Sequence, residues 1–225
     1  MKKKLFFYAF LFVTIILSGC QSEEIYSCNP EINEWVHDNL DEIRAMSRST
    51  WNHLDESVKR ATFRAFTQQQ KIDFWKDKLN EVLQMDWNDE EKAHIAIILN
   101  YIDKNPQIFN RAKEMTDEEQ EKMDIFFYKW VEDAKIRLNW DMPLIKGIVA
   151  TGNTLVDKSG KIRTSTQSKA IVKSSGESEC ECEIDQFIAW CITMDCEKSR
   201  SGCEKLPDGC GFLLSYPCDG TCGGI

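Results

Sequence analysis

The chain has 225 residues, of which 37 are Asp or Glu and 28 are Lys or Arg, so its formal net charge is −9. This length accommodates one moderate domain with an appendage. The net charge is −10 over residues 21–145, +5 over 146–176 and −7 over 177–225. Two acidic blocks joined by a basic strap argue against a nucleic-acid partner, because binding nucleic acid requires a basic face.

The first 20 residues are arranged like an export signal. Lysines at positions 2–4 precede an apolar run over 5–17, which is shorter than the roughly 20 residues that a membrane-spanning helix needs. The run ends in Leu-Ser-Gly-Cys, which is similar to the lipobox of bacterial lipoproteins and implies cleavage before Cys20 and acylation of that residue. We therefore expect a lipoprotein signal peptide over residues 1–19 and a tether over 20–28, with an uncleaved anchor as the alternative.

The residues after Cys20 bear on where the protein is held. The tetrapeptide Gln-Ser-Glu-Glu is similar to the surface-export signal of some Gram-negative lipoproteins. Together with the lipobox, it predicts attachment to the membrane through the N-terminal lipid. The expected location is the cell envelope, at the outer membrane or cell surface of a Gram-negative bacterium.

Residues 29–145 are predicted to form an all-α bundle of five or six helices. Asn29 followed by Pro30 is typical of a helix start, and further helices are expected over 55–66 and 108–113. Three capping boxes mark the starts of the longer helices: Thr67 with Gln70, Asn88 with Glu91, and Thr116 with Glu119. The last begins the most regular apolar stripe: Met123, Phe126, Phe127, Trp130, Val131, Ala134 and Leu138. Because the stripes are long and capped, we expect this domain to fold without the tail.

The composition changes after residue 145. Residues 146–179 are basic and rich in Ser, Thr and Lys, and they contain the turn-like sequences Thr-Gly-Asn-Thr and Lys-Ser-Gly-Lys. We therefore predict a linker over 146–179, with at most one loose hairpin in it.

Residues 180–225 hold eight of the ten cysteines, well above the ~8–10% that marks a disulfide scaffold. The eight are Cys180, Cys182, Cys191, Cys196, Cys203, Cys210, Cys218 and Cys222. Because an exported chain meets an oxidising compartment, we predict a small disulfide-rich domain with four bridges among them. Eight cysteines allow about 105 pairings, so the connectivity stays open. A thiolate metal site is the alternative, since Cys-x-Cys and Cys-x3-Cys pairs can chelate a metal.

Cys28 is the odd cysteine by position. With Cys20 acylated, nine cysteines remain. One of them is then unpaired, pairs between chains, or leaves a partner in the tail unpaired. We assign Cys28 as the unpaired or intermolecular cysteine.

The sequence contains no motif of a known catalytic type. The three histidines, His37, His53 and His94, form no H-E-x-x-H pair, and G-x-S-x-G is absent. A helical histidine beside carboxylates is typical of an ordinary surface position. We therefore predict no enzyme activity, no catalytic residues, no cofactor and no metal.

The tail resembles the bacteriocin fulvocin C-related proteins. The resemblance rests on Cys180-Glu-Cys182, Cys191, Gly209-Cys210-Gly211 and Cys218-x-Gly220-x-Cys222. It extends less specifically to the helical part between Leu54 and Leu79, around Lys-Arg-Ala-Thr-Phe-Arg-Ala-Phe and Phe-Trp. The resemblance implies a disulfide-stapled peptide of bacteriocin-like ancestry behind a longer helical region, and it does not establish killing activity.

Two functions follow as hypotheses. The first is an envelope-anchored lipoprotein whose tail is a bacteriocin-like antibacterial effector, released when the linker is cut. The alternative is a non-enzymatic surface binding module whose cysteine-rich tail recognises a protein or glycan partner and stays attached. The tail's charge of −7 argues against adsorption to anionic membranes, where each Lys or Arg contributes about 1 kcal/mol.

Overall fold

The computed structural model describes residues 24–110, 115–165, 181–182, 196–198, 206–218 and 220–222. The predicted signal peptide and residues 166–179 of the predicted linker lie outside these ranges. The predictions made for those segments therefore stay predictions.

The described part of the chain is mainly helical, as the sequence predicts. Its α-helices are α1 (Pro30–Asp38), α2 (Leu40–Arg44), α3 (Arg48–Trp51), α4 (Glu56–Ala65), α5 (Gln68–Leu83), α6 (Asp89–Lys104), α7 (Asp117–Arg137) and α8 (Met142–Val149). Two 3-10 helices, η1 (Pro106–Phe109) and η2 (Phe212–Leu214), complete the helical elements. The fold class is confirmed: a helical region is followed by a small C-terminal region that contains a disulfide.

The helix starts follow the local chemistry of the sequence. The Asn29 side chain accepts hydrogen bonds from the main-chain N–H groups of Glu31 and Ile32, and Pro30 occupies the first helical position. All three predicted capping boxes form, and each has both of its reciprocal hydrogen bonds. These predictions are confirmed because a cap depends only on residues within one turn.

Two short helices were not predicted. Helix α3 has four residues and α8 has eight, which is too few for a periodic apolar pattern to emerge. Asp141 caps α8 by accepting from the main-chain N–H of Leu144. Where a helix is predicted over 108–113, the structure has η1, which ends at Phe109, and residues 111–113 lie outside the described ranges.

The predicted linker begins later than residue 146, so that boundary is corrected. Ile148, Val149 and Ala150 are buried in the helical core. Leu155 and Ile162 then form an antiparallel bridge, and the chain is described as far as residue 165. This is the hairpin anticipated from the turn-like sequences. It belongs to the helical body because its polar groups are bound there, as described below.

The C-terminal strands form two small antiparallel sheets. Strands β1 (Glu181–Cys182), β5 (Gly220–Cys222) and β2 (Cys196–Lys198) form one sheet in the order β1-β5-β2. Strands β3 (Leu206–Cys210) and β4 (Tyr216–Cys218) form the other, with η2 between them. In this second sheet Leu206 lies opposite Cys218, and Cys210 lies opposite Tyr216.

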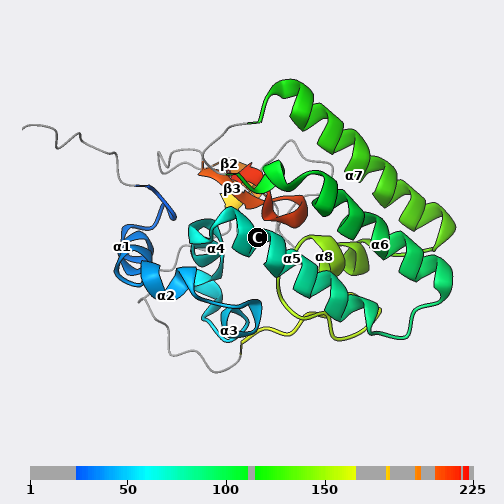
Figure 1. Ribbon diagram of the computed structural model, residues 1–225, viewed down its shortest axis with the longest axis horizontal. Helices are drawn as coiled ribbons and strands as arrows, with labels where there is room; N and C mark the ends of the chain where they lie inside the picture. The colour runs from blue at the N-terminus through cyan, green and yellow to red at the C-terminus, as the bar shows by residue number, and fades with distance from the viewer. Residues whose placement is uncertain are drawn as a thin grey trace, which may run out of the picture.

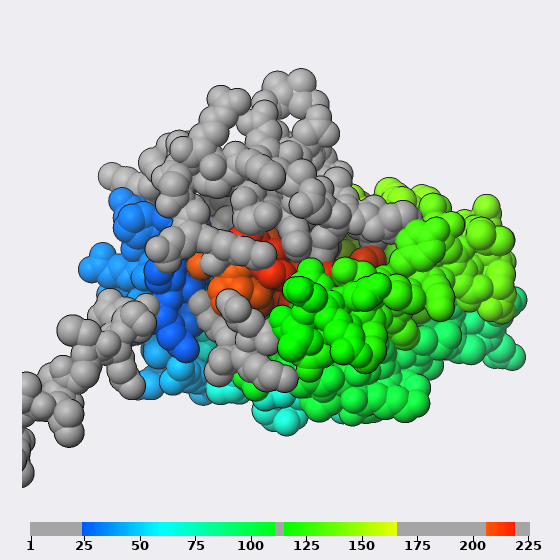
Figure 2. All heavy atoms as spheres, turned by 90° about the horizontal axis from the view of Figure 1, so that it is seen from above, coloured from blue at the N-terminus to red at the C-terminus, as the bar shows by residue number. Residues whose placement is uncertain are grey.

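Residues 206–218, hereafter the tail segment, are part of the helical core. In Figure 1 the orange and red C-terminal segment lies between α4 and α7, and Figure 2 shows it between the blue and green parts of the chain. Its apolar side chains belong to the same buried cluster as those of the helices. The rings of Phe212 and Phe127 are stacked with centroids 4.3 Å apart, and the Tyr216 hydroxyl donates to Asp124 at 2.7 Å. These contacts give a reason to revise the expectation that the helices fold without the tail.

The substitution Phe212→Ala tests whether the tail segment and the helices unfold together. Removing this buried ring should lower the free energy of unfolding by about 3 kcal/mol. The loss should be visible in the helical signal when denaturant unfolding is followed by far-ultraviolet circular dichroism. Ile136, which is 77% exposed on α7, supplies the control, and Ile136→Ala should change stability by less than about 0.5 kcal/mol. An unchanged helical transition in Phe212→Ala would show that the tail segment folds separately.

Candidate functional site

Five positively charged side chains are buried along α3, α4 and α5. They are Arg48, Lys59, Arg64, Lys71 and Lys78, each at most 5% exposed. We call them the cationic clamp. Lys and Arg are almost never buried this deeply unless they are paired, because an unpaired charge is costly to desolvate. Their partners include two segments that lie far away in sequence, as well as carboxylates of α4 and α5 and a main-chain oxygen before α1.

The first segment is the turn that follows α8. Lys59 Nζ donates to the side-chain oxygen of Asn153 at 2.8 Å, and Lys78 Nζ donates to the Asn153 main-chain oxygen. Arg48 Nε donates to the carbonyl of Gly152 at 3.0 Å. Three cations from three helices therefore hold two adjacent residues of this turn.

Carboxylates at the surface end of the clamp balance part of its charge. Arg48 forms ion pairs with Asp77 and Glu81, both at 2.9 Å, and Lys59 pairs with Glu56 at 2.7 Å. These acids are partly exposed, whereas the cations are not. These ion pairs balance part of the positive charge. The remaining donors of Arg48 and Lys59 bind the Gly152–Asn153 turn.

Gly152 is required where the turn meets the helices. A Cβ at this position would lie 2.2 Å from Cζ of Phe74 and 2.9 Å from the Trp51 ring. Only a residue without a side chain can bring its backbone this close to the two rings.

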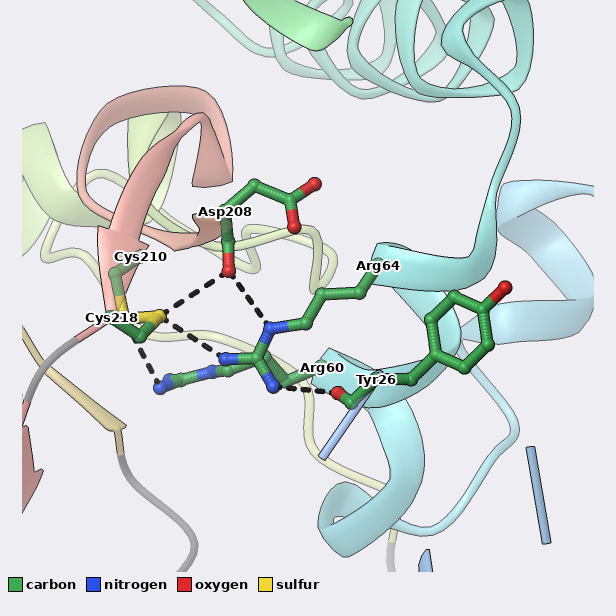
Figure 3. Close-up of a disulfide and its surroundings, with 6 residues drawn as sticks. All are labelled: Tyr26, Arg60, Arg64, Asp208, Cys210 and Cys218. Carbon is green, nitrogen blue, oxygen red and sulfur yellow. Dashed lines mark hydrogen bonds between the residues drawn. A yellow bond between two sulfur atoms is a disulfide. The ribbon is translucent and has the colours of Figure 1, made fainter. Parts of the chain in front are cut away.

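The second segment is the Pro-Asp-Gly stretch of β3, where the register of the small sheet shifts (Figure 3). Arg64 Nε donates to the main-chain oxygen of Asp208 at 2.8 Å, and Lys71 forms a buried ion pair with the Asp208 carboxylate. Arg64 Nη1 also donates to the main-chain oxygen of Tyr26 at 2.9 Å. A single guanidinium therefore joins the start of the helical body to the tail segment. Gly209 makes room for it: its φ is +103°, and a Cβ there would lie 2.6 Å from Arg64 Nε.

One disulfide of the tail is described, and it lies against the same arginine. Cys210 and Cys218 are bonded, with their Cα atoms 5.4 Å apart. Arg64 Nη2 lies 3.1 Å from the sulfur of Cys218, and Arg60 Nη1 lies 3.7 Å from the sulfur of Cys210. Both sulfurs are buried. This bridge agrees with the prediction of disulfides within the tail.

The other predicted cysteines are placed only in part. Backbone pairing brings Cys196 opposite Cys222 across β2 and β5, and Cys182 lies opposite Gly220 across β1 and β5. The predicted acylation site Cys20 and the tail cysteines Cys180, Cys191 and Cys203 lie outside the described residues.

Cys28 forms a disulfide, so its assignment as an unpaired or intermolecular cysteine is wrong for this single chain. Cys210 and Cys218 are bonded to each other. The lipidation of Cys20 and the other bridges of the tail stay predictions.

The histidines have structural surroundings. His94 is buried rather than at the surface, with its ring stacked on Trp130 at a centroid distance of 4.7 Å. Its ring nitrogen and its main-chain carbonyl both form hydrogen bonds with Trp130. Burial lowers the pKa of His94, and the charge of Asp133 opposes this shift. His37 and His53 each contact a main-chain carbonyl at the surface.

A surface hollow lies beside the first part of the clamp. It has a volume of about 270 Å³ and lies between α4, the residues after α8 and η2. Its polar lining includes Glu56, Arg60 and Asn153, and its apolar lining includes Trp51 and Leu214. The hollow therefore presents carboxylate, guanidinium and amide groups next to apolar walls.

Among the residues that the structure describes, no three His, Cys, Asp or Glu side chains are grouped to hold a metal ion. Over those same residues, no helix combines the length and apolarity needed to cross a bilayer. Comparisons with protein-family models, curated proteins and solved structures found no match to the chain.

The clamp was not predicted from the sequence, although a signal for it exists. Lys71 and Lys78 lie on the same helical face as Trp75 and Val82, in the middle of the apolar stripe of α5. A lysine within such a stripe either extends to the surface or is buried with a partner. Helical spacing cannot distinguish these cases, because the partner comes from a distant segment.

Lys78 should make the stability of the protein depend on pH. The pKa of Lys78 is lowered from 10.5 to about 7, first by burial and second by the charge of Arg48, while the charge of Glu81 opposes the shift. Between these two values the unfolded chain binds more protons than the folded one, so stability should rise with pH. Lys78→Met removes this slope. The stability of the wild type relative to Lys78→Met should therefore increase by about 2 kcal/mol from pH 7 to pH 9, as measured by denaturant unfolding.

The exposed Lys122 supplies the control for this experiment. Its bond to Glu118 raises its pKa, so it titrates above the window tested. Lys122→Met should keep the wild-type slope. Equal slopes in wild type and Lys78→Met would mean that Lys78 stays charged when buried.

Proposed function

We propose that the chain is a non-enzymatic lipoprotein of the bacterial cell envelope that acts as a surface binding module, with its cysteine-rich tail retained on the helical body. One observation carries this choice over a released antibacterial effector. The tail segment shares the core of the helices and supplies the partners that hold Arg64 and Lys71. A peptide that must leave would have to break these contacts.

Release of the tail segment would be costly. It would expose the buried side chains of Phe212, Leu213 and Tyr216. It would also remove the Asp208 contacts of two buried cations, and breaking a buried ion pair typically costs about 3–5 kcal/mol. Cutting the chain within residues 166–179 would leave all of these contacts in place, which favours retention.

The hollow beside α4 supports a polar partner. Glu56, which is partly exposed, and Arg60 line this hollow beside apolar side chains. Such a mixture of polar and apolar groups suits a sugar unit or a polar protein side chain. The proposed partner is therefore a protein or a glycan of the cell surface.

Retention can be tested by cutting the chain between body and tail. We expect a protein with a protease site inserted after Ala170 to elute as one species from a sizing column after complete cleavage. The same experiment on a Cys28→Ser variant removes any covalent link through that residue. Co-elution in both proteins would show that packing and the clamp hold the tail. Separation of the tail from cleaved Cys28→Ser without denaturant would contradict retention by the clamp.

Binding can be tested with the chain from residue 21 onward, which lacks the lipid. The labelled protein should bind saturably to intact cells of related bacteria, and unlabelled protein should compete. Loss of binding after protease treatment of the cells identifies a protein partner, and loss after periodate oxidation identifies a glycan. Absence of saturable binding, together with growth inhibition by isolated oxidised residues 177–225, would instead support the antibacterial effector.

A further inference from the structure

We infer that the helical body is a template for disulfide formation in its own tail, with Arg64 as the residue that activates Cys218 for bonding to Cys210. This role for the body is independent of what the protein binds. It rests on the contacts of one buried arginine and on the packing of the tail segment around it (Figure 3).

The tail needs a means of selecting which of its cysteines bond to each other. Its eight cysteines allow about 105 complete pairings. A short segment with few apolar residues cannot fix its own shape before the bridges form. Selection by the helices, as the tail segment packs against them, removes this difficulty.

The packing of the tail segment brings Cys210 and Cys218 together by contacts other than the bond itself. Leu206 and Tyr216, which lie opposite the two cysteines in the small sheet, are buried in the core. The Lys71–Asp208 ion pair holds β3 against α5. Docking of these groups onto the helices therefore sets the register in which the two sulfurs meet.

Two guanidinium groups of α4 lie beside the sulfurs. From α4, Arg64 Nη2 lies 3.1 Å from the Cys218 sulfur and Arg60 Nη1 lies 3.7 Å from the Cys210 sulfur. The nearest acid of the tail segment, Asp208, is paired with Lys71 of α5, and its carboxylate points away from the sulfurs. A guanidinium beside a thiol stabilises its ionised form, which is the nucleophile in disulfide exchange.

The reaction proceeds in two exchanges. While the tail is undocked, the Cys210 thiolate attacks a donor disulfide, which is either a small molecule or an exported dithiol oxidoreductase. A mixed disulfide forms and one donor thiolate leaves. As the segment docks, the Cys218 thiolate beside Arg64 attacks the Cys210 sulfur, and the second donor thiolate leaves. The two cysteines lose two protons and two electrons, and the donor disulfide is reduced to two thiols.

The test is the order and the pH dependence of bridge formation. The chain from residue 21 onward is reduced, unfolded and returned to native conditions with oxidised glutathione. Samples are trapped by alkylation at successive times and mapped by mass spectrometry. Cys210–Cys218 should be the first bridge to accumulate, and Arg64→Gln should slow it about tenfold at pH 6, equivalent to one unit in the thiolate midpoint.

Two further variants separate activation from packing. Arg64→Lys keeps the charge and should keep the wild-type pH at which the rate is half-maximal, even where docking is weaker. Arg60→Gln, whose guanidinium is farther from sulfur, should shift that pH less than Arg64→Gln does. A rate lowered equally at every pH in Arg64→Gln would mean that Arg64 only packs. Accumulation of a different bridge first in the wild type would overturn the template itself.

Discussion

Burial of positive charge is the constraint on which this structure depends. Lysine and arginine side chains on α3, α4 and α5 are removed from water, and such groups are tolerated only where oxygen atoms replace the lost solvent. The oxygens come from the Gly152–Asn153 turn, from Asp208 and from Tyr26. Carboxylates of Glu56, Asp77 and Glu81 supply the rest. Asp208 lies in β3, where the register of the small sheet shifts. The helices and the two segments therefore complete one another.

This dependence connects the fold to the proposed function. A tail that completes the core of its carrier is suited to remain on it, and its cysteine-rich sheet is then presented from a fixed base. Arg64 is central to this arrangement because its guanidinium contacts the N-terminal segment at Tyr26, β3 at Asp208 and the sulfur of Cys218. The same contacts that argue for retention place a positive charge where a thiolate forms before oxidation.

Features that depend on neighbouring residues could be predicted from the sequence, whereas features that depend on contacts between distant segments could not. Helix starts at Asn29, Thr67, Asn88 and Thr116 were predicted correctly because each cap involves residues within one turn. The clamp was missed because Arg64 and Asp208 are 144 residues apart in the chain, and composition made residues 146–165 resemble a linker. The cysteine content indicated disulfides, but the pairing of Cys28 depends on which segments lie beside it in the fold, and no spacing rule contains that information.

The most direct test of the clamp is a double-mutant cycle across the Lys71–Asp208 ion pair. Lys71→Met, Asp208→Asn and the double variant are compared with the wild type by denaturant unfolding at constant pH. If the buried pair couples the tail segment to α5, each single substitution leaves a charge uncompensated and costs more than removal of both. We predict a coupling energy of about 2 kcal/mol or more. Additive effects, within about 0.5 kcal/mol, would show that the tail segment rests on the helices without being held by this charge.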